Sequence, residues 1–155
     1  MRKAMLLVAL FGLASLLWAA DPIVGTWKVN LAKSKPAPGQ QATVKEMTVV
    51  TREVGADLET TFDGISADGS PFSMKFTNPQ QGGVLKSGQA ATEGTFVVIT
   101  VIRPGEMYGT SVQNGKQVEV THTVVSKDGK TMSRTSRAID AQGKINESLM
   151  IFDKQ

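Results

Sequence analysis

The chain has 155 residues, a formal net charge of +3, one histidine and no cysteine. The absence of cysteine excludes a disulfide scaffold, a lipid-modified cysteine and, with only one histidine, a typical zinc site. This length is enough for one domain with a hydrophobic core of its own.

Residues 1–20 have the layout of a secretory signal peptide. Arg2 and Lys3 give a cationic start, an almost wholly apolar run reaches Trp18, and two small alanines end the segment at Ala20. The apolar run is shorter than the roughly 20 residues that a membrane span needs. We expect cleavage near Ala20, with the exact bond open, and an uncleaved anchor is the alternative.

The predicted mature domain, residues 21–155, is nearly neutral, because the leader removes two basic residues and no acidic one. This balance indicates no nucleic-acid partner and no binding to an anionic membrane surface. We therefore expect export of a single domain, without a membrane span after cleavage, to the periplasm or the extracellular space. The sequence leaves the oligomeric state open.

The mature domain begins with a half-buried β-strand. From Ile23, every second residue, including Trp27 and Val29, lies on one face, while Val24 and Lys28 lie on the other. Further strands are predicted at 43–54, 57–66, 71–77, 83–87, 95–103, 106–113, 116–126, 130–139 and 145–153. No stretch shows sustained helical periodicity.

The connections between these strands predict hairpins. Asn114-Gly115 and Asp128-Gly129 stand between apolar runs and suit tight turns. About ten short strands without crossover helices predict an all-β fold, namely an antiparallel up-and-down barrel of about 8–10 strands, with a sandwich as the alternative. The last strand carries Ile145, Leu149 and Ile151 on one face and could pair with the first strand to close the sheet. The strand at 95–103 is apolar on both faces, so we expect it to be covered twice or to contact a partner.

Two segments give a family resemblance. The segments Gly25-Thr26-Trp27-Lys28-Val29 and Ile151-Phe152-Asp153-Lys154, with the many hairpin strands between them, resemble the lipocalin and fatty-acid-binding protein superfamily, the calycins. The stretches 27–35 and 125–132 resemble small secreted bacterial lipocalin-like proteins of unassigned function. The resemblance implies a lipocalin-like barrel over 21–155, with Gly25 and Trp27 as structural residues and Trp27 packed across one end.

The sequence departs from the fatty-acid-binding proteins at two places. Their two lid helices cannot fit into residues 33–43, a segment with two prolines. Their Arg-x-Tyr pair near the end of the chain corresponds here to Met150 and Phe152, neither of which carries a charge or a hydroxyl. The expected ligand is therefore neutral and apolar, or is held by another polar group.

The candidate ligand-binding residues are of two kinds. The apolar candidates for the barrel lining are Phe72, Met74, Phe76, Phe96, Val98 and Leu149. The polar candidates are Arg134, as an inward-pointing cation, Tyr108, at a pocket rim, and His122, which shares a strand face with valines. For these three, the competing interpretation is ordinary packing or a surface position.

Three functions remain open from the sequence. Binding of a small apolar molecule ranks first, a structural or protein-interaction barrel with a filled interior ranks second, and a barrel enzyme or haem protein using His122 ranks last. No catalytic motif occurs in the sequence, so no catalytic residue, metal site or cofactor is predicted, and an absence of enzyme activity is favoured.

Overall fold

The computed structural model describes residues 20–86 and 95–155. Ten strands and no helix occur in these ranges. The strands are β1 (Gly25–Val29), β2 (Val44–Val54), β3 (Asp57–Ser66), β4 (Pro71–Pro79), β5 (Gly83–Val84), β6 (Thr95–Arg103), β7 (Glu106–Gln113), β8 (Lys116–Val125), β9 (Thr131–Ile139) and β10 (Ile145–Lys154). Among the described residues there is no helix with the length and hydrophobicity to cross a membrane. The predicted leader, apart from Ala20, lies outside the described residues.

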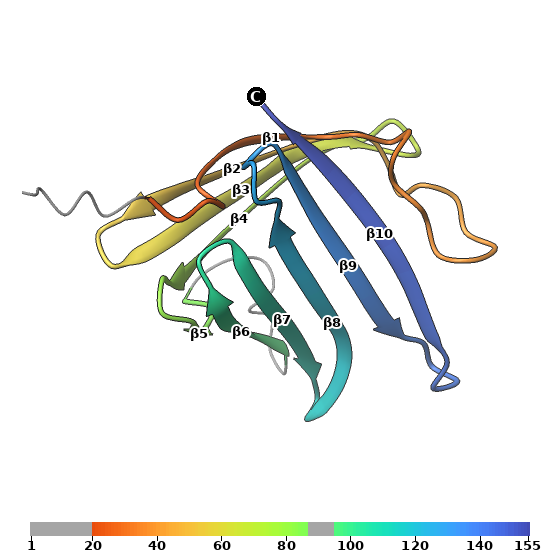
Figure 1. Ribbon diagram of the computed structural model, residues 1–155. Helices are drawn as coiled ribbons and strands as arrows, with labels where there is room; N and C mark the ends of the chain where they lie inside the picture. Colours follow the sequence, from red (N-terminus) through yellow and green to blue (C-terminus); the bar gives the residue numbers. More distant parts are fainter. Residues whose placement is uncertain (1–19, 87–94) are drawn as a thin grey trace, which may run out of the picture.

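All ten strands form one antiparallel sheet in the order β4-β3-β2-β1-β10-β9-β8-β7-β6-β5. Strands that follow one another in the chain are neighbours in the sheet, apart from β4 and β5 at its two edges. At the centre β1 pairs with β10, and Trp27 lies opposite Lys154. Figure 1 shows the sheet curling so that β4 and β5 approach each other. The predicted fold class, an antiparallel up-and-down barrel, is confirmed, as is the pairing of the first and last strands.

The barrel has a seam between its two edge strands, β4 and β5. Across it, the Lys86 backbone N–H donates to the Thr77 carbonyl oxygen at 2.8 Å. The Lys86 ammonium also reaches over to β3, where its Nζ lies 2.6 Å from the Asp57 carboxylate. The edges β4 and β5 are therefore joined by isolated contacts and not by a strand ladder, so the barrel is nearly but not fully closed.

The turns follow from local backbone chemistry. Between β7 and β8, Asn114 and Gly115 both have positive φ, 50° and 76°, as a two-residue hairpin turn with the right twist requires. Strand β5 is shorter than the predicted 83–87, and residue 87 lies outside the described residues. Just before β5, a Cβ on Gly82 would lie 2.8 Å from the Ile99 carbonyl oxygen, so a side chain there would push the edge away from β6.

The core lies where β1 and β10 meet. Trp27 and Phe152 have no exposed surface, and Val49 on β2 is almost as deeply buried. The Trp27 indole Nε1 donates to the Ile23 carbonyl oxygen at 2.8 Å, so the buried ring keeps its polar atom satisfied. The Lys154 ammonium lies 5.0 Å from the Trp27 ring centroid, a cation–π contact. Burial of each large side chain contributes about 1.5–3 kcal/mol to stability.

The segment before β1 is tied to the turn between β6 and β7. The Asp21 carboxylate oxygen Oδ1 accepts hydrogen bonds from the backbone N–H groups of Ile23, at 3.0 Å, and Gly105, at 2.9 Å. Ile23 in turn accepts the hydrogen bond of Trp27. Residues 21–27 are therefore held against the turn between β6 and β7, whereas the barrel-closing role that the resemblance implies for Gly25 and Trp27 stays a prediction.

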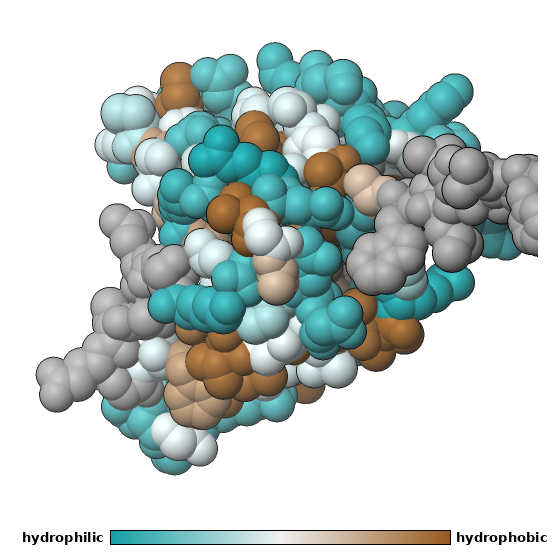
Figure 2. Space-filling model, turned by 90° about the vertical axis from the view of Figure 1, so that its left-hand side faces the viewer, coloured by the Kyte–Doolittle hydropathy of each residue, from teal (hydrophilic) through white to brown (hydrophobic). Residues whose placement is uncertain are grey.

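The outer face of β5 and β6 remains apolar and exposed. Val84, Phe96 and Ile102 keep 54%, 44% and 54% of their surface accessible within the described part of the molecule. In Figure 2, hydrophobic side chains form brown areas among hydrophilic ones on the side facing the viewer. Of the two arrangements predicted for strand 95–103, coverage on both faces is not found among the described residues, which enclose only its inward face, and contact with a partner stays a prediction.

Candidate functional site

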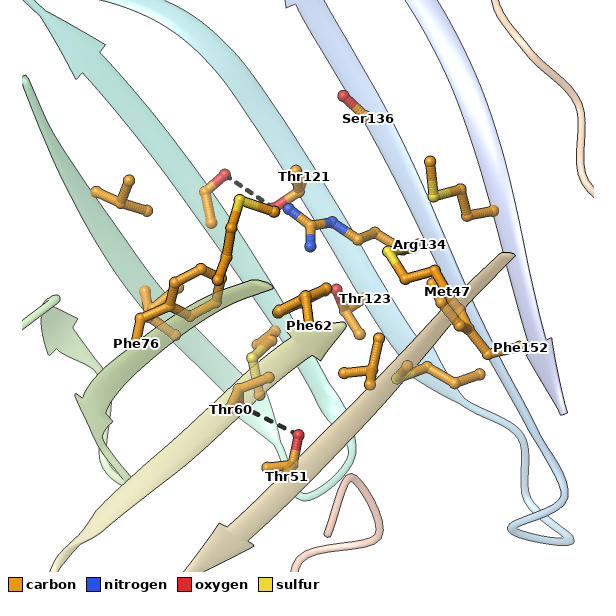
Figure 3. A pocket seen from close by; sticks show the side chains of 18 of the residues that line it. Met47, Thr51, Thr60, Phe62, Phe76, Thr121, Thr123, Arg134, Ser136 and Phe152 are labelled. Carbon is orange, nitrogen blue, oxygen red and sulfur yellow. Dashed lines mark hydrogen bonds between the residues drawn. The ribbon is translucent and has the colours of Figure 1, made fainter. Parts of the chain in front are cut away.

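The barrel encloses a cavity of about 560 Å³. Its lining comes from β2, β3, β4, β6, β7, β8, β9 and β10, with Ile23, Thr43 and Leu85 from the connecting segments. Figure 3 shows these side chains converging from strands on opposite sides of the barrel. Because side chains alternate along each strand, every lining strand contributes only one of its faces.

The half of the cavity formed by β2, β3 and β4 is predominantly apolar, and we call it the apolar wall. Its residues are Val44, Met47, Val49, Phe62, Phe72, Met74 and Phe76. The rings of Phe62 and Phe76 pack with their centroids 5.1 Å apart and their planes tilted by 43°. The neighbouring hydroxyls of Thr51 and Thr60 are 3.2 Å apart and hydrogen-bond to each other. They therefore add little polarity to this side.

Methionine is a recurrent residue of the lining. All five methionines that follow the predicted leader border the cavity: Met47, Met74, Met107, Met132 and Met150. They come from five different strands, so they surround the space instead of filling one corner. Unbranched thioether side chains change rotamer easily and contact aromatic rings favourably. The cavity can therefore adapt its shape to an apolar guest.

The inner face of β7 to β10 has the opposite character, and we call it the polar wall. Its polar residues are Ser111, Glu119, Thr121, Thr123, Arg134, Ser136 and Ser148. The strand register brings them together, because Thr123 lies opposite Arg134, and Ser136 lies between Thr121 on β8 and Ser148 on β10. The result is a continuous polar surface facing the apolar wall.

Arg134 places a cation inside the barrel. Figure 3 shows its side chain extending into the cavity towards Thr121. The guanidinium carbon lies 5.6 Å from the centroid of the Phe62 ring. Burial lowers the pKa of the Arg134 guanidinium, and the Glu119 carboxylate acts in the opposite direction. Within residues 20–86 and 95–155, Arg134 makes no side-chain hydrogen bond and no ion pair, so its donors face the cavity.

Glu119 is the acidic residue of the polar wall. The Ser136 hydroxyl donates a short hydrogen bond to the Glu119 carboxylate oxygen Oε1. Among the described residues, the second oxygen has no hydrogen-bond partner. Glu119 and Arg134 are the charged residues among those that border the cavity, and their formal charges cancel. The cavity therefore combines one acidic and one basic group without a net charge.

Four of the residues predicted from the sequence lie on the cavity wall. Phe72, Met74 and Phe76 share the inner face of β4, as their alternation predicts, and Arg134 points inward from β9. By contrast, Arg137 is exposed and pairs with Glu147 at 2.6 Å. The two arginines of β9 therefore lie on opposite faces, as their odd spacing requires.

Three apolar candidates do not line the cavity, and this corrects the sequence prediction. Phe96 and Val98 lie on the outer face of β6, whereas Val97 and Ile99 line the inside. Leu149 lies on the outer face of β10. The reason is that the fully buried Phe152 fixes the inward face, and Met150 and Ser148 follow it at intervals of two residues.

Tyr108 and His122 also lie outside the cavity. Their rings stack on the outer surface, with centroids 4.3 Å apart and an interplanar angle of 4°. The His122 Nε2 lies 3.0 Å from the Glu106 carboxylate, which also pairs with Arg103 at 2.6 Å. Arg103, and then His122, hold the pKa of the Glu106 carboxyl below its usual range. An interior haem or general-base role for His122 is therefore corrected, because its ring faces away from the cavity.

Sequence reasoning missed most of the polar wall. On β8 it favoured the valine-rich face that includes His122, whereas Glu119, Thr121 and Thr123 face inward. A signal was available in the Asp128-Gly129 turn. A two-residue turn at this point sets Thr123 opposite Arg134, so an inward Arg134 implies an inward Thr123.

Comparison with known proteins supports the fold. No protein-family model matches the sequence, and no curated protein matches it significantly. Zebrafish ileal bile acid-binding protein, solved in complex with cholic acid, superposes with a TM-score of 0.53 at 13% identity, over 86% of this chain and 99% of that one. The chain has a lipocalin-like barrel fold.

Two further solved structures resemble the lipocalin-like barrel less closely. Lobster apocrustacyanin A1 gives a TM-score of 0.46 at 12% identity, over 86% of this chain and 61% of that one. A de novo designed fluorescence-activating β-barrel gives 0.45 at 17% identity, over 88% of this chain and all of the designed one, 100%. At such identities the likeness concerns the fold, and the function must be argued from the cavity.

Proposed function

We propose that this lipocalin-like barrel binds a small, largely apolar molecule in its cavity. The observation that carries the proposal is the enclosed volume of about 560 Å³, bordered by an apolar wall and a polar wall. Sites for small molecules typically have volumes of about 300–1,000 Å³ and combine apolar surface with a few polar groups. An interior filled by side chains, the alternative function, does not fit an open space of this size.

The two walls suit different parts of one ligand. Contact with the phenylalanines and methionines of the apolar wall removes hydrophobic surface from water, at about 25 cal/mol for each Å². The polar wall offers hydrogen-bonding groups that orient the ligand and add selectivity. The proposed molecule is therefore predominantly hydrophobic, with a smaller polar part.

Adjacent residues of β6 provide a matched test of this proposal. Val97 lines the cavity, and Val98 points outward. The substitution Val97→Trp fills part of the cavity, whereas Val98→Trp adds the same side chain outside. We expect the neutral fluorophore N-phenyl-1-naphthylamine to bind the wild type and V98W equally, and to bind V97W at least about tenfold more weakly.

Fluorescence titration of the three purified proteins measures these affinities, with circular dichroism as the check on folding. The proposal fails if the fluorophore does not bind the wild type and a panel of neutral aromatic and alkyl compounds also produces no thermal shift. It also fails if V97W and V98W, both folded, bind the fluorophore as well as the wild type.

We also propose that the barrel acts after export. The support is the cationic and apolar leader of residues 1–20, followed by a nearly neutral domain. Expression of the full chain in a Gram-negative bacterium, followed by fractionation and intact-mass measurement, tests this. We expect a periplasmic or extracellular product lacking about twenty residues, and full-length protein in the cytoplasm would contradict the proposal.

A further inference from the structure

The polar wall contains a half-buried donor group that faces the cavity and has no acceptor among the described residues. The Arg134 guanidinium carries five N–H donors in a planar fork, and none has an acceptor among the described residues. The Phe62 ring below it offers only a cation–π contact at 5.6 Å. An unpaired hydrogen-bond donor that faces a cavity favours a guest that supplies an acceptor.

The same wall contains an acceptor with spare capacity. Ser136 occupies one carboxylate oxygen of Glu119 and leaves the other without a partner among the described residues. Glu119 and Arg134 do not form a direct ion pair, although the Glu119 charge acts on Arg134. The two groups therefore present an acceptor and a donor separately to the cavity, and the Arg134 side chain extends towards Thr121, which is two residues from Glu119 on β8 (Figure 3).

The charges of these two residues select against an ionic guest. A carboxylate at Arg134 would be attracted by the guanidinium but repelled by Glu119, and an ammonium at Glu119 would be attracted by the carboxylate but repelled by Arg134, so the repulsion offsets part of each gain. In a cavity of low polarity neither repulsion is screened well. A neutral group with an acceptor and a donor side by side avoids both repulsions and satisfies both residues.

We infer that the ligand of this barrel carries a neutral head group of the carboxamide type, whose carbonyl oxygen accepts from Arg134 and whose N–H donates to Glu119. The inference rests on the proposed function and specifies the chemical class of its ligand. Ser111, Thr123 and Ser148 line the same surface with hydroxyls that make no side-chain hydrogen bond within the described ranges. They provide further polar contacts around the head group.

A series of compounds with one hydrophobic body tests the inference. The compounds are 2-naphthamide, 2-naphthoate, methyl 2-naphthoate and 2-methylnaphthalene, each in competition with N-phenyl-1-naphthylamine. The amide presents an acceptor together with a donor, and the naphthoate presents an anion. The ester presents an acceptor alone, and 2-methylnaphthalene has no polar group. We expect the amide to bind about tenfold more tightly than the ester or the anion, the difference that one additional hydrogen bond makes.

Two inward variants and one outward control assign the effect to residues. Arg134→Met is expected to weaken the binding of the amide and of the ester by about tenfold, because both lose the same hydrogen-bond donor. Glu119→Gln is expected to raise the affinity for the anion, relative to that for the amide, by about tenfold, because the repulsion between the anion and the Glu119 carboxylate disappears. Arg137→Met, on the exposed face of β9, should change none of the affinities. Binding of 2-methylnaphthalene should stay within about twofold in every variant, which shows that the cavity remains intact.

The outcomes separate this inference from the proposed function. If 2-methylnaphthalene binds but the amide has no advantage, the head-group inference is overturned and the proposed function stands. If the anion binds most tightly and loses affinity in R134M, the head group is an acid and the inference is overturned. If none of the four compounds nor the fluorophore binds, both proposals fail.

Discussion

The two walls of the cavity are built from similar antiparallel strands but use opposite side chains. On β2 to β4 the inward residues are mainly phenylalanine, methionine and valine, whereas on β7 to β10 they are mostly hydroxyl and charged residues. The outer faces partly reverse this pattern, because β8 presents Val118, Val120 and Val124 outward. A barrel strand therefore does not always turn its more hydrophobic face inward.

The difference between the two walls separates a role in folding from a role in ligand selection. The apolar wall continues into the buried cluster around Trp27 and Phe152, so its residues contribute to folding as well as to the cavity. The polar wall contributes fewer members to that cluster and carries the two charged groups. We therefore expect substitutions in the apolar wall to affect mainly stability, and substitutions in the polar wall to affect mainly ligand choice.

The largest expected effect is on the apolar wall. Phe62→Ala removes a ring that is 8% exposed and packs against Phe76, and it should lower the free energy of unfolding by about 3–5 kcal/mol. Thr123→Val, a change of similar shape on the polar wall, should alter it by less than about 1 kcal/mol. Urea unfolding followed by tryptophan fluorescence measures both. Equal losses in the two variants would contradict the division between the walls.

An intermediate effect of opposite sign is expected at Arg134. Arg134→Met replaces a half-buried cation, unpaired among the described residues, with a flexible apolar side chain that largely keeps the packing of the three arginine methylenes. The free energy of unfolding of the ligand-free protein should rise by about 1–2 kcal/mol. Thermal unfolding by calorimetry provides the measurement, with R137M as the exposed control. A clear loss of stability in R134M alone would show that Arg134 supports the fold.

The smallest effect is expected on the outer surface, away from both walls. The Lys75 ammonium, 2.5 Å from Glu59, and then the Arg52 guanidinium hold the pKa of the Glu59 carboxyl below its usual value of 4.5. Because the folded-state pKa is the lower one, this stabilisation is complete above the usual pKa and is lost as the pH falls through the folded-state value. Glu59→Gln should therefore make the acid-side decline in melting temperature slightly shallower.

The control for this last prediction is Glu53→Gln, at an exposed carboxyl on β2. Melting temperatures measured between pH 6 and pH 3 should show the shallower decline only for E59Q. A parallel profile for the wild type and E59Q would mean that solvent screens these surface ion pairs completely.

Most of the strands could be predicted from the sequence because their boundaries are set by local chemistry. Glycine-containing turns follow most of the strands, and alternation assigns Phe72, Met74 and Phe76 to one face, which is the inner face in the structure. The fold follows from many hairpins without a crossover helix. These signals act over two to ten residues, so they are visible in a single sequence.

The inward face of β6, β8 and β10 could not be predicted in the same way. β6 is apolar on both sides, and on β8 and β10 the more hydrophobic face points outward. Which face is inward depends on pairing with distant strands, as when Phe152 packs beside Trp27. The more hydrophobic face of a strand is expected to point inward when the interior is a packed core. Here half of the interior is a polar surface that borders a cavity, so that expectation selects the outer face of β8 and β10.

The seam lies between β4 and β5, so it separates the first four strands of the chain from the last six. The first four strands and the last six are joined within the sheet by the ladder between β1 and β10, and at the seam by contacts such as that from Lys86 to Thr77. A single cut at the Gln80–Gln81 bond would leave the ladder between β1 and β10 unbroken. We therefore expect the barrel to tolerate reconstitution from two fragments, which would make it a split protein whose reassembly depends on the pairing of its first and last strands.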